Sequence, residues 1–266
     1  MTLAEITAQL RSAGIEGAAS EARALICRFE SISSAVLLAD PGRDFCSRQL
    51  SDAVARRVSR EPLQYILGTV GFYHEEYEVS PACLIPRADT ELLVEEAIRR
   101  TPSGTRFADL CTGSGCIAIS VLAARQDLTA VAVDISAEAL AIAAKNAQKN
   151  GVADRLTLVQ ADLLSDIPDA VLAVDTVLSN PPYIRRAVIP TLDIEVQREP
   201  VIALDGGEDG LLFYRRMLKT LSPSLFLFEI GYDQKEDLLS LSAATDYKAL
   251  CLRDLGDRDR VMILEK

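Results

Sequence analysis

The spacing of apolar residues in the first part of the chain is helical. Between residues 2 and 60, apolar side chains recur every three or four positions, as in ITAQLRSAGI, EARALICRF and LSDAVARRV, which predicts amphipathic helices. ADPGRD at 39–44 predicts a turn between two of them, because Pro-Gly continues neither helix. Residues 1–60 therefore read as a small N-terminal helical domain.

The pattern changes over residues 61–86. Aromatic and β-branched residues alternate there with polar ones between prolines and glycines, which predicts a β-hairpin linker. His74, the only histidine, falls in this hairpin, and we expect it at the surface. DTELLVEEAIRR, residues 89–100, then predicts a helix with one apolar face and with Asp89 as its N-cap.

Strand-like and helix-like segments alternate from residue 106 onward. They are RFADL, CIAISVLAARQ, TAVAVD, SAEALAIAAKNAQKNG, LTLVQAD, DTVLSN, GLLFYRRMLKTL and SLFLFEIG. Such alternation predicts a parallel sheet with crossover helices. Two last strands, YKALCLRD and DRVMILEK, lie close enough in sequence to form a hairpin. The expected fold class is α/β, with a Rossmann-like sheet, a helical domain and a hairpin linker.

Composition narrows the classes of protein. The 266 residues are 49% hydrophobic, enough for one large core and a small second one. No apolar run approaches a membrane span, and the first residues, MTLAEITAQL, lack the features of a signal peptide. We therefore expect a cytoplasmic protein with no membrane partner. Six scattered cysteines without a CxxC pair indicate reduced thiols and no metal site. The net charge of −11 argues against binding to a nucleic-acid backbone.

A glycine-rich turn, ADLCTGSGCIA at 108–118, follows a predicted strand and opens a helix. Gly113 and Gly115 would let a ligand approach the backbone at the helix start. Asp134 ends the next strand, where a carboxylate can accept both hydroxyls of a ribose. The turn also fits the dinucleotide fingerprint, so NAD-type cofactors stay open. Asp109 favours S-adenosylmethionine, because a carboxylate there would repel a pyrophosphate and attract the cationic end of the methyl donor.

The stretch VLSNPPYI, residues 177–184, ends another predicted strand. Asn180 precedes two prolines, which fix the backbone in an extended conformation. Pro181 offers a carbonyl and no N–H, and the side chain of Asn180 offers a second acceptor oxygen. Two acceptors match one NH2 group of a planar amide or aromatic amine, on which Tyr183 would stack.

That arrangement suits methyl transfer to a poorly nucleophilic nitrogen. Two acceptors would hold both N–H bonds and stabilise the positive charge that develops on nitrogen. Positioning of this kind can supply about 7–11 kcal/mol of the barrier, so no strong base is needed. A plain strand-ending turn is the simpler interpretation of Asn-Pro. The functional interpretation is favoured because ligands bind at the carboxyl ends of parallel strands.

The chain resembles the release-factor glutamine methyltransferases, the HemK-type enzymes that methylate the glutamine side-chain amide in a Gly-Gly-Gln loop. The resemblance runs from residue 61 to residue 260, and residues 1–60 match mainly in being helical. It is carried, in order, by EPLQYILG, LIPRADTELLVE, DLCTGSGCIAIS, VAVDIS, LSNPPYI, ALDGGEDGLLFYRRM, FEIGYDQ and DLGDRDRV. It implies a class I methyltransferase domain over residues 87–266 and a peptide chain release factor as partner.

The resemblance also implies roles for single residues. The donor S-adenosylmethionine, with S-adenosylhomocysteine as product, would be bound by Asp109, Cys111, Thr112, Gly113, Ser114, Gly115, Asp134, Asp162, Leu163 and Asn180. Asn180, Pro181 and Tyr183 would act on the glutamine, and Pro182 would help to bind it. Many methyltransferases carry glycine in place of Cys111. Many relatives carry a large aromatic residue in place of Leu163, where adenine would here meet a plain apolar contact.

Three alternatives stay open at this point. A ribosomal-protein glutamine methyltransferase is one, although IPRADTE looks more like the release-factor enzymes. A nucleic-acid adenine N6-methyltransferase would use the same four residues but should show a basic groove. A non-catalytic dinucleotide-binding module leaves the Asn-Pro-Pro-Tyr turn unexplained. For Arg87, a salt bridge and substrate positioning stay equally open. We expect a monomer whose helical domain and hairpin grip the protein substrate.

Overall fold

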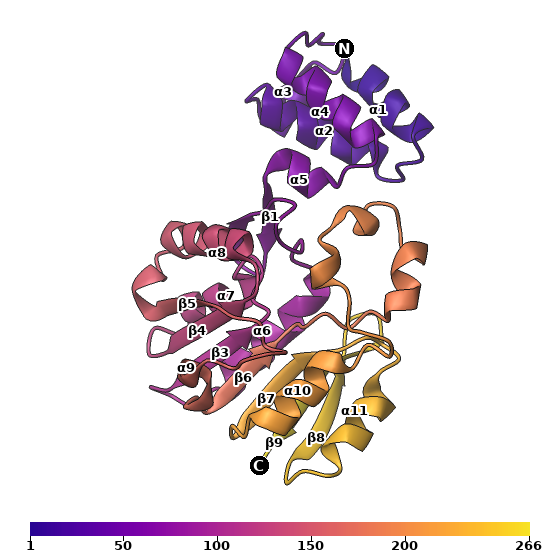
Figure 1. Cartoon of the computed structure of the whole chain (residues 1–266). Helices are drawn as coiled ribbons and strands as arrows, with labels where there is room; N and C mark the ends of the chain where they lie inside the picture. The colour runs from indigo at the N-terminus through magenta and orange to yellow at the C-terminus, as the bar shows by residue number, and fades with distance from the viewer. The chain divides into compact units, whose positions relative to one another are not determined.

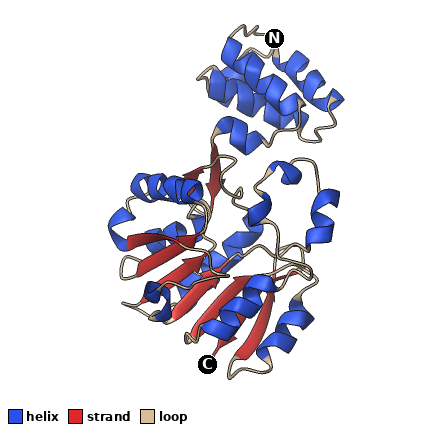
Figure 2. Cartoon of the chain, in the orientation of Figure 1, coloured by secondary structure: helices blue, strands red, loops and turns tan.

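The computed structural model describes all residues, 1–266, and divides the chain into two compact units (Figures 1 and 2). The smaller unit comprises Met1–Thr69 together with Asp193–Arg198. The larger unit comprises Val70–Leu192 and Glu199–Lys266. None of the helices is both long enough and apolar enough to span a bilayer.

The smaller unit is helical, as the apolar spacing predicts. Its helices are α1 (Leu3–Ser12), α2 (Ala18–Phe29), α3 (Ser34–Ala39), α4 (Arg48–Val58) and α5 (Leu63–Leu67). Thr2 and Glu5 form a capping box that satisfies backbone N–H groups at the start of α1. The predicted turn at 39–44 separates α3 from α4. Apolar side chains from all five helices form a core of their own.

The linker contains the expected hairpin and one element that the pattern does not reveal. Strands β1 (Thr69–Phe72) and β2 (Glu75–Glu78) pair as a two-stranded sheet, with His74 exposed at the turn. Before them, LQYIL forms α5, which ends at Gly68 in the left-handed conformation. Five residues are too few to show a helical period, so the sequence pattern predicts them as part of the β-hairpin linker, residues 61–86.

The prediction of Asp89 as a helix N-cap is wrong. A 3-10 turn, η1 (Ala88–Thr90), precedes α6 (Glu91–Arg100), and Asp89 lies inside that turn. Its carboxylate instead forms an ion pair with Arg260 at 3.3 Å. Because the 3-10 turn comes first, α6 begins at Glu91, two residues after the aspartate that the sequence suggests as its cap.

The larger unit is built on a seven-stranded sheet, which confirms the predicted α/β class. The strands are β3 (Arg106–Leu110), β4 (Thr129–Asp134), β5 (Leu156–Gln160), β6 (Thr176–Ser179), β7 (Leu225–Glu229), β8 (Lys248–Arg253) and β9 (Asp259–Glu265). Their order is β5-β4-β3-β6-β7-β9-β8. Strands β3 to β7 run parallel, and β9 is antiparallel to both β7 and β8.

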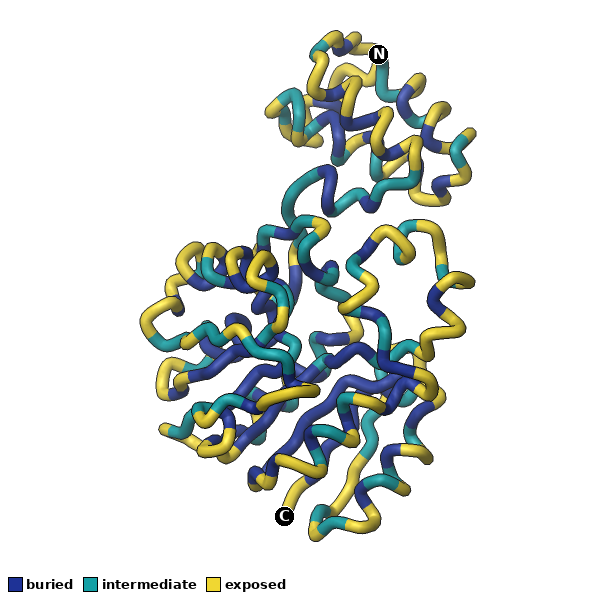
Figure 3. Tube along the Cα trace, viewed as in Figure 1, coloured by how far each residue is buried: buried dark blue, intermediate teal, exposed yellow.

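Helices cover both faces of this sheet. They are α6, α7 (Cys116–Ala124), α8 (Ala137–Lys149), α9 (Asp169–Leu172), α10 (Leu212–Thr220) and α11 (Lys235–Ser242). Short 3-10 turns occur in this unit at η2 (Ala153–Arg155), η3 (Arg186–Thr191) and η5 (Val201–Ala203), whereas η4 (Val196–Arg198) belongs to the smaller unit. In β7, Leu225 and Leu227 enter one core while Phe226 and Phe228 enter the other. The sheet is therefore buried on both sides, as Figure 3 shows for its central strands.

The strand order creates a switch point beside β3. From β3 the chain moves to β4 on one side, whereas from β6 it moves to β7 on the other. Ligands of open α/β sheets bind at the carboxyl ends of the strands where the order reverses. Leu110 and Ser179 are register partners at the ends of β3 and β6. Cys111 and Asn180, the next residues, therefore leave the sheet side by side.

Candidate active site

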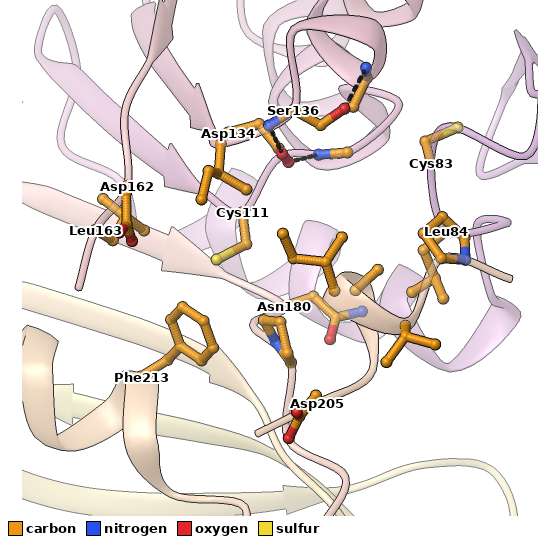
Figure 4. Close-up of a pocket in the computed structure, with 18 of the residues that line it drawn as sticks. Cys83, Leu84, Cys111, Asp134, Ser136, Asp162, Leu163, Asn180, Asp205 and Phe213 are labelled. Atoms are coloured by element: carbon orange, nitrogen blue, oxygen red, sulfur yellow. Dashed lines mark hydrogen bonds between the residues drawn. The ribbon is translucent and has the colours of Figure 1, made fainter. Parts of the chain in front are cut away.

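A cavity of about 450 Å³ opens at the switch point (Figure 4). All of its lining residues belong to the larger unit. The predicted site residues that line it are Cys111, Gly113, Asp134, Asp162, Leu163, Asn180 and Pro182. The predicted residues that do not line it are Asp109, Thr112, Ser114, Gly115, Pro181 and Tyr183. The structure thus brings the glycine-rich turn and the Asn-Pro-Pro-Tyr turn to one cavity, and some residues of each turn line it.

The glycine turn after β3 needs its two glycines for different reasons. Gly113 has a φ of 56°, lines the cavity, and would meet nothing within 4 Å if it carried a Cβ. Gly115 has a φ of 82°, and a Cβ there would lie 2.8 Å from Ile119 Cδ1 and 3.1 Å from Ala143 Cβ. Gly113 therefore leaves open space for a ligand, whereas Gly115 allows α7 and α8 to approach each other.

Cys111 also adopts a left-handed backbone, with a φ of 62°. Such a conformation costs an L-residue other than glycine about 1–2 kcal/mol, which explains why glycine suits this position in many methyltransferases. The side chain lines the cavity. Burial raises the pKa of the Cys111 thiol well above its ordinary value, so the thiol is neutral and acts as a small apolar wall.

Asp134 closes the turn. Its Oδ2 accepts a hydrogen bond from Gly113 N at 2.8 Å, and its Oδ1 accepts one from Ser136 N at 2.9 Å (Figure 4). Burial raises the pKa of Asp134, and the backbone N–H groups of Ser136, Gly113 and Ile135 oppose that rise. Each carboxylate oxygen keeps a free lone pair after these bonds. Asp134 can therefore accept two further hydroxyl groups, as the position at the end of a strand predicts.

Asp109 is fully buried at the end of β3. Its Oδ2 accepts hydrogen bonds from Thr112 Oγ1 at 2.6 Å and from Ala118 N at 3.2 Å, so it braces the turn from inside. Its Oδ1 has no hydrogen-bond partner in the protein. Burial raises the pKa of Asp109 to about 7. The sequence placed Asp109 in contact with the donor; the structure places it outside the cavity lining, with one unpaired oxygen.

An apolar wall faces the polar turn. Leu163, after β5, is 4% exposed and lines the cavity, and its carbonyl accepts a hydrogen bond from Arg216 Nε at 2.9 Å. Phe213, from α10, lines the cavity as well (Figure 4). Sequence analysis missed Phe213, because its position in a helical pattern gives no sign of what the helix faces. An aromatic ring is thus present at this cavity although Leu163 is not aromatic.

Asn180 is held by a chain of hydrogen bonds that reaches another strand. Its Nδ2 donates to Thr90 Oγ1 at 3.3 Å. The Thr90 hydroxyl donates to Glu229 Oε2 at 2.5 Å, and the Tyr183 hydroxyl donates to Glu229 Oε1 at 3.2 Å. Glu229 ends β7 and is 1% exposed. Because the amide nitrogen of Asn180 is engaged with Thr90, its oxygen remains as the acceptor for a ligand.

Comparisons with known proteins decide the family. Residues 2–68 match the PrmC N-terminal domain, and residues 88–194 match the methyltransferase small domain. A release factor glutamine methyltransferase of Caulobacter vibrioides is 37% identical over 96% of this chain and 92% of its own length. The chain belongs to the release factor glutamine methyltransferase family. A second member, from Moorella thermoacetica, is 37% identical over 98% of this chain and 96% of that one.

A solved structure supports the fold of this glutamine methyltransferase. The complex of Mtq2 and Trm112 from E. cuniculi, described as responsible for methylation of the eRF1 translation termination factor, covers 70% of this chain and 99% of its own, with a TM-score of 0.50 and 22% identity. At that identity the likeness concerns the fold alone. The likeness confirms the predicted methyltransferase sheet. The relatives and the family models confirm the family and the transferase class, and they set the non-catalytic dinucleotide module aside.

Arg87 of this glutamine methyltransferase forms an ion pair with Glu199 Oε1. Glu199 is 4% exposed, and its Oε2 accepts a hydrogen bond from Ile85 N at 3.0 Å. The pair joins the start of η1 to the segment that follows Asn180 and Tyr183 in the chain. The salt-bridge interpretation of Arg87 is therefore the one that its contacts support.

Proposed function

We propose that the protein transfers a methyl group from S-adenosylmethionine to the side-chain amide nitrogen of the glutamine in the Gly-Gly-Gln loop of a peptide chain release factor. The observation that carries this proposal is the orientation of Asn180, whose nitrogen is engaged with Thr90 and whose oxygen is left as an acceptor. Pro181 does not itself line the cavity; its carbonyl, which has no N–H beside it, would be the second acceptor. Two acceptors without an adjacent donor match an amide NH2 group.

The residues around the cavity fit S-adenosylmethionine. Asp134 keeps two lone pairs for the ribose hydroxyls. Leu163 and Phe213 supply apolar surface for the adenine ring. Asp109 lies outside the cavity lining with its Oδ1 unpaired, and in its ionised form it would favour a cationic group beside the turn. When bound, S-adenosylmethionine supplies a methyl group on a positively charged sulfur, whose transfer to nitrogen leaves neutral S-adenosylhomocysteine and releases one N–H proton to water.

The protein contributes positioning rather than a strong base. Asn180 Oδ1 and the Pro181 carbonyl would accept the two N–H bonds of the glutamine amide and so aim its nitrogen at the methyl group. These acceptors also stabilise the positive charge on nitrogen during transfer. Burial raises the pKa of Tyr183 well above its ordinary value, so its ring is a neutral surface on which the planar amide can stack.

The helical unit is proposed to grip the release factor, while the larger unit holds the methyl donor. The net charge of −11 suits a basic face on the partner. A monomeric protein that acts in the cytoplasm, without nucleic acid or membrane, stays our prediction. Association rates that barely change between low and high salt would contradict electrostatic attraction to the partner.

Mass spectrometry of a bacterial release factor tests the proposal. After incubation with the protein and S-adenosylmethionine, we expect one added methyl group on the glutamine of the Gly-Gly-Gln peptide. Asn180→Ala should reduce the rate at least about 100-fold, because one acceptor of the NH2 group is lost. Asn150→Ala, at the C-cap of α8, is the matched control and should keep the wild-type rate.

Two other results would redirect the assignment. Methylation of a ribosomal protein, with the release factor unmodified, would favour the ribosomal-protein glutamine methyltransferases. Methylation of adenine in nucleic acid would favour the nucleic-acid adenine N6-methyltransferases. An Asn180→Ala enzyme that methylates the release factor at the wild-type rate would contradict the role of the Asn-Pro-Pro-Tyr turn, whatever the substrate.

A further inference from the structure

Glu229 lies behind the Asn-Pro-Pro-Tyr turn, with its carboxylate fully inside the protein. The side chain comes from the end of β7 and is 1% exposed. One carboxylate oxygen accepts from the Thr90 hydroxyl at 2.5 Å and the other accepts from the Tyr183 hydroxyl at 3.2 Å. A buried carboxylate is costly unless it has partners. One oxygen of Glu229 is thus connected through Thr90 to Asn180, the first residue of the turn, and the other binds Tyr183, the last residue of the turn.

The direction of the hydrogen bonds fixes the amide of Asn180. A threonine hydroxyl has a single proton, and Thr90 gives it to the Glu229 carboxylate. Toward Asn180, the Thr90 oxygen can then only accept, and it accepts from Nδ2 at 3.3 Å. The two ends of an asparagine amide have nearly the same shape, so sterics alone would not choose between them. A rotated amide would offer a donor to the substrate NH2 group, which needs an acceptor.

We propose that Glu229 and Thr90 are positioning residues for methyl transfer, which hold Asn180 with its oxygen toward the substrate and hold the ring of Tyr183 through its hydroxyl. This inference rests on the proposed function. Neither residue lines the cavity, so both act through the turn and neither is a catalytic residue. Burial raises the pKa of Glu229, and the Thr90 hydroxyl, Arg260 and the Tyr183 hydroxyl oppose that rise. In its ionised form the carboxylate donates nothing and accepts from both hydroxyls.

Thr90 allows a test with near-isosteric variants. Thr90→Val removes the hydroxyl and keeps the shape, which leaves the Asn180 amide free to rotate. We expect kcat for release-factor methylation to fall between about 10-fold and 100-fold, with the Kd for S-adenosylmethionine unchanged. Thr90→Ser restores the hydroxyl and should recover most of kcat. A merely structural role would predict no such rescue, since serine loses the methyl group that packs.

A double variant separates positioning from general weakening of the fold. In the Asn180→Ala background, Thr90→Val should have no further effect on kcat, because the group that it orients is gone. Glu229→Gln should lower kcat as Thr90→Val does. The glutamine amide can donate to Thr90, which would reverse the direction of the hydrogen bonds between residue 229, Thr90 and Asn180. A further loss of tenfold or more on adding Thr90→Val to Asn180→Ala would overturn the proposal.

The wild-type assay keeps this inference distinct from the proposed function. No methylation of the release factor by the wild-type protein would refute the function, whereas wild-type activity that survives Thr90→Val within twofold would refute the positioning role. The side-chain NH2 signal of Asn180 in 15N NMR gives a readout without any substrate. It should move in Thr90→Val and return toward its wild-type position in Thr90→Ser; an unmoved signal would also refute the positioning role.

Discussion

Asp109 and Cys111, beside the cavity, are each in an energetically unfavourable state. The carboxylate of Asp109 is buried with Oδ1 unpaired, and the backbone of Cys111 is in the left-handed region. Strain and unpaired polar atoms of this kind concentrate at functional sites, where the surrounding structure holds them in place. At the scale of the residue, these two features support the proposal that the turn after β3 binds a ligand, and both lower the stability of the fold.

The cost at Asp109 should appear as a pH dependence of stability. Burial raises its pKa to about 7 in the folded protein, whereas an aspartate in an unfolded chain titrates near about 3.9. Between these values the folded state holds a proton that the unfolded state has lost, so the free energy of unfolding falls as pH rises from about 4 to about 7. The difference between the two pKa values corresponds to a change of at most about 4 kcal/mol in the free energy of unfolding.

Urea unfolding without cofactor, at several pH values between 4 and 8, measures this dependence. Asp109→Asn cannot titrate, so its free energy of unfolding should fall less than that of the wild type over the same range. Asp154→Asn, at an exposed position, should follow the wild-type curve. Parallel curves for wild type and Asp109→Asn would show that the carboxyl group has an ordinary pKa.

At the scale of the element, the Asn-Pro-Pro-Tyr turn is held by the segment before α10. Ile184 N donates to Leu204 O at 3.0 Å, and Gly206 N donates to Ile184 O at 2.9 Å. A Cβ on Gly206 would lie 2.8 Å from the Pro182 carbonyl oxygen and 2.8 Å from Tyr183 Cα. Glycine at this position therefore lets two backbone segments touch and fixes where the turn sits.

Gly206→Ala should displace the turn, because both groups that its Cβ would meet are backbone atoms. We expect a loss of about 1–3 kcal/mol in the free energy of unfolding and a fall in kcat of about 10-fold to 100-fold. Gly71→Ala is the matched control, since a Cβ there meets nothing within 4 Å. Equal kcat values for the two variants would show that the turn tolerates the added methyl group.

The elements also show what the sequence could predict. Strands β3 to β7 and helices α7, α8 and α10 follow from the alternation of strand-like and helix-like apolar segments along the chain. The 3-10 turns η3, η4 and η5, which lie between the Asn-Pro-Pro-Tyr turn and α10, are too short to leave such a pattern. The cavity wall from Phe213 and the contact of Thr90 with Asn180 depend on tertiary packing, which the pattern along the chain does not record.

At the scale of the whole molecule, the helical unit includes a segment that sequence analysis assigned to the methyltransferase domain. Residues 193–198 belong to the compact unit of Met1–Thr69. Glu195 accepts from Arg60 Nε at 2.7 Å and from Arg57 Nη1 at 3.1 Å. Its position is 138 residues from Arg57 in the sequence, so no local pattern could have joined them. The hexapeptide is continuous in the chain with the segment that leaves the Asn-Pro-Pro-Tyr turn.

Glu195→Ala should release this hexapeptide from the helical unit without unfolding the unit. Arg57 is 5% exposed and keeps its second partner, Glu21, at 2.6 Å, so no buried charge is left alone. Hydrogen bonds to charged groups are worth about 1.5–3 kcal/mol each, and we expect a loss within that range. Hydrogen exchange should become faster in residues 193–198 and in the adjoining residues up to the turn, while exchange in α2 and α4 stays slow.

Asp193→Ala is the matched control, because it removes an exposed carboxylate from the same segment. The control should keep the slow exchange of the wild type. If residues 193–198 exchange at the same rate in Glu195→Ala and in the wild type, the ion pairs with Arg57 and Arg60 do not hold the segment. If Glu195→Ala speeds exchange and also raises KM for the release factor, with the Kd for S-adenosylmethionine unchanged, the result would support a functional link between the helical unit and the Asn-Pro-Pro-Tyr turn through this segment. That outcome would support the proposal that the helical unit binds the release factor while the larger unit holds the methyl donor.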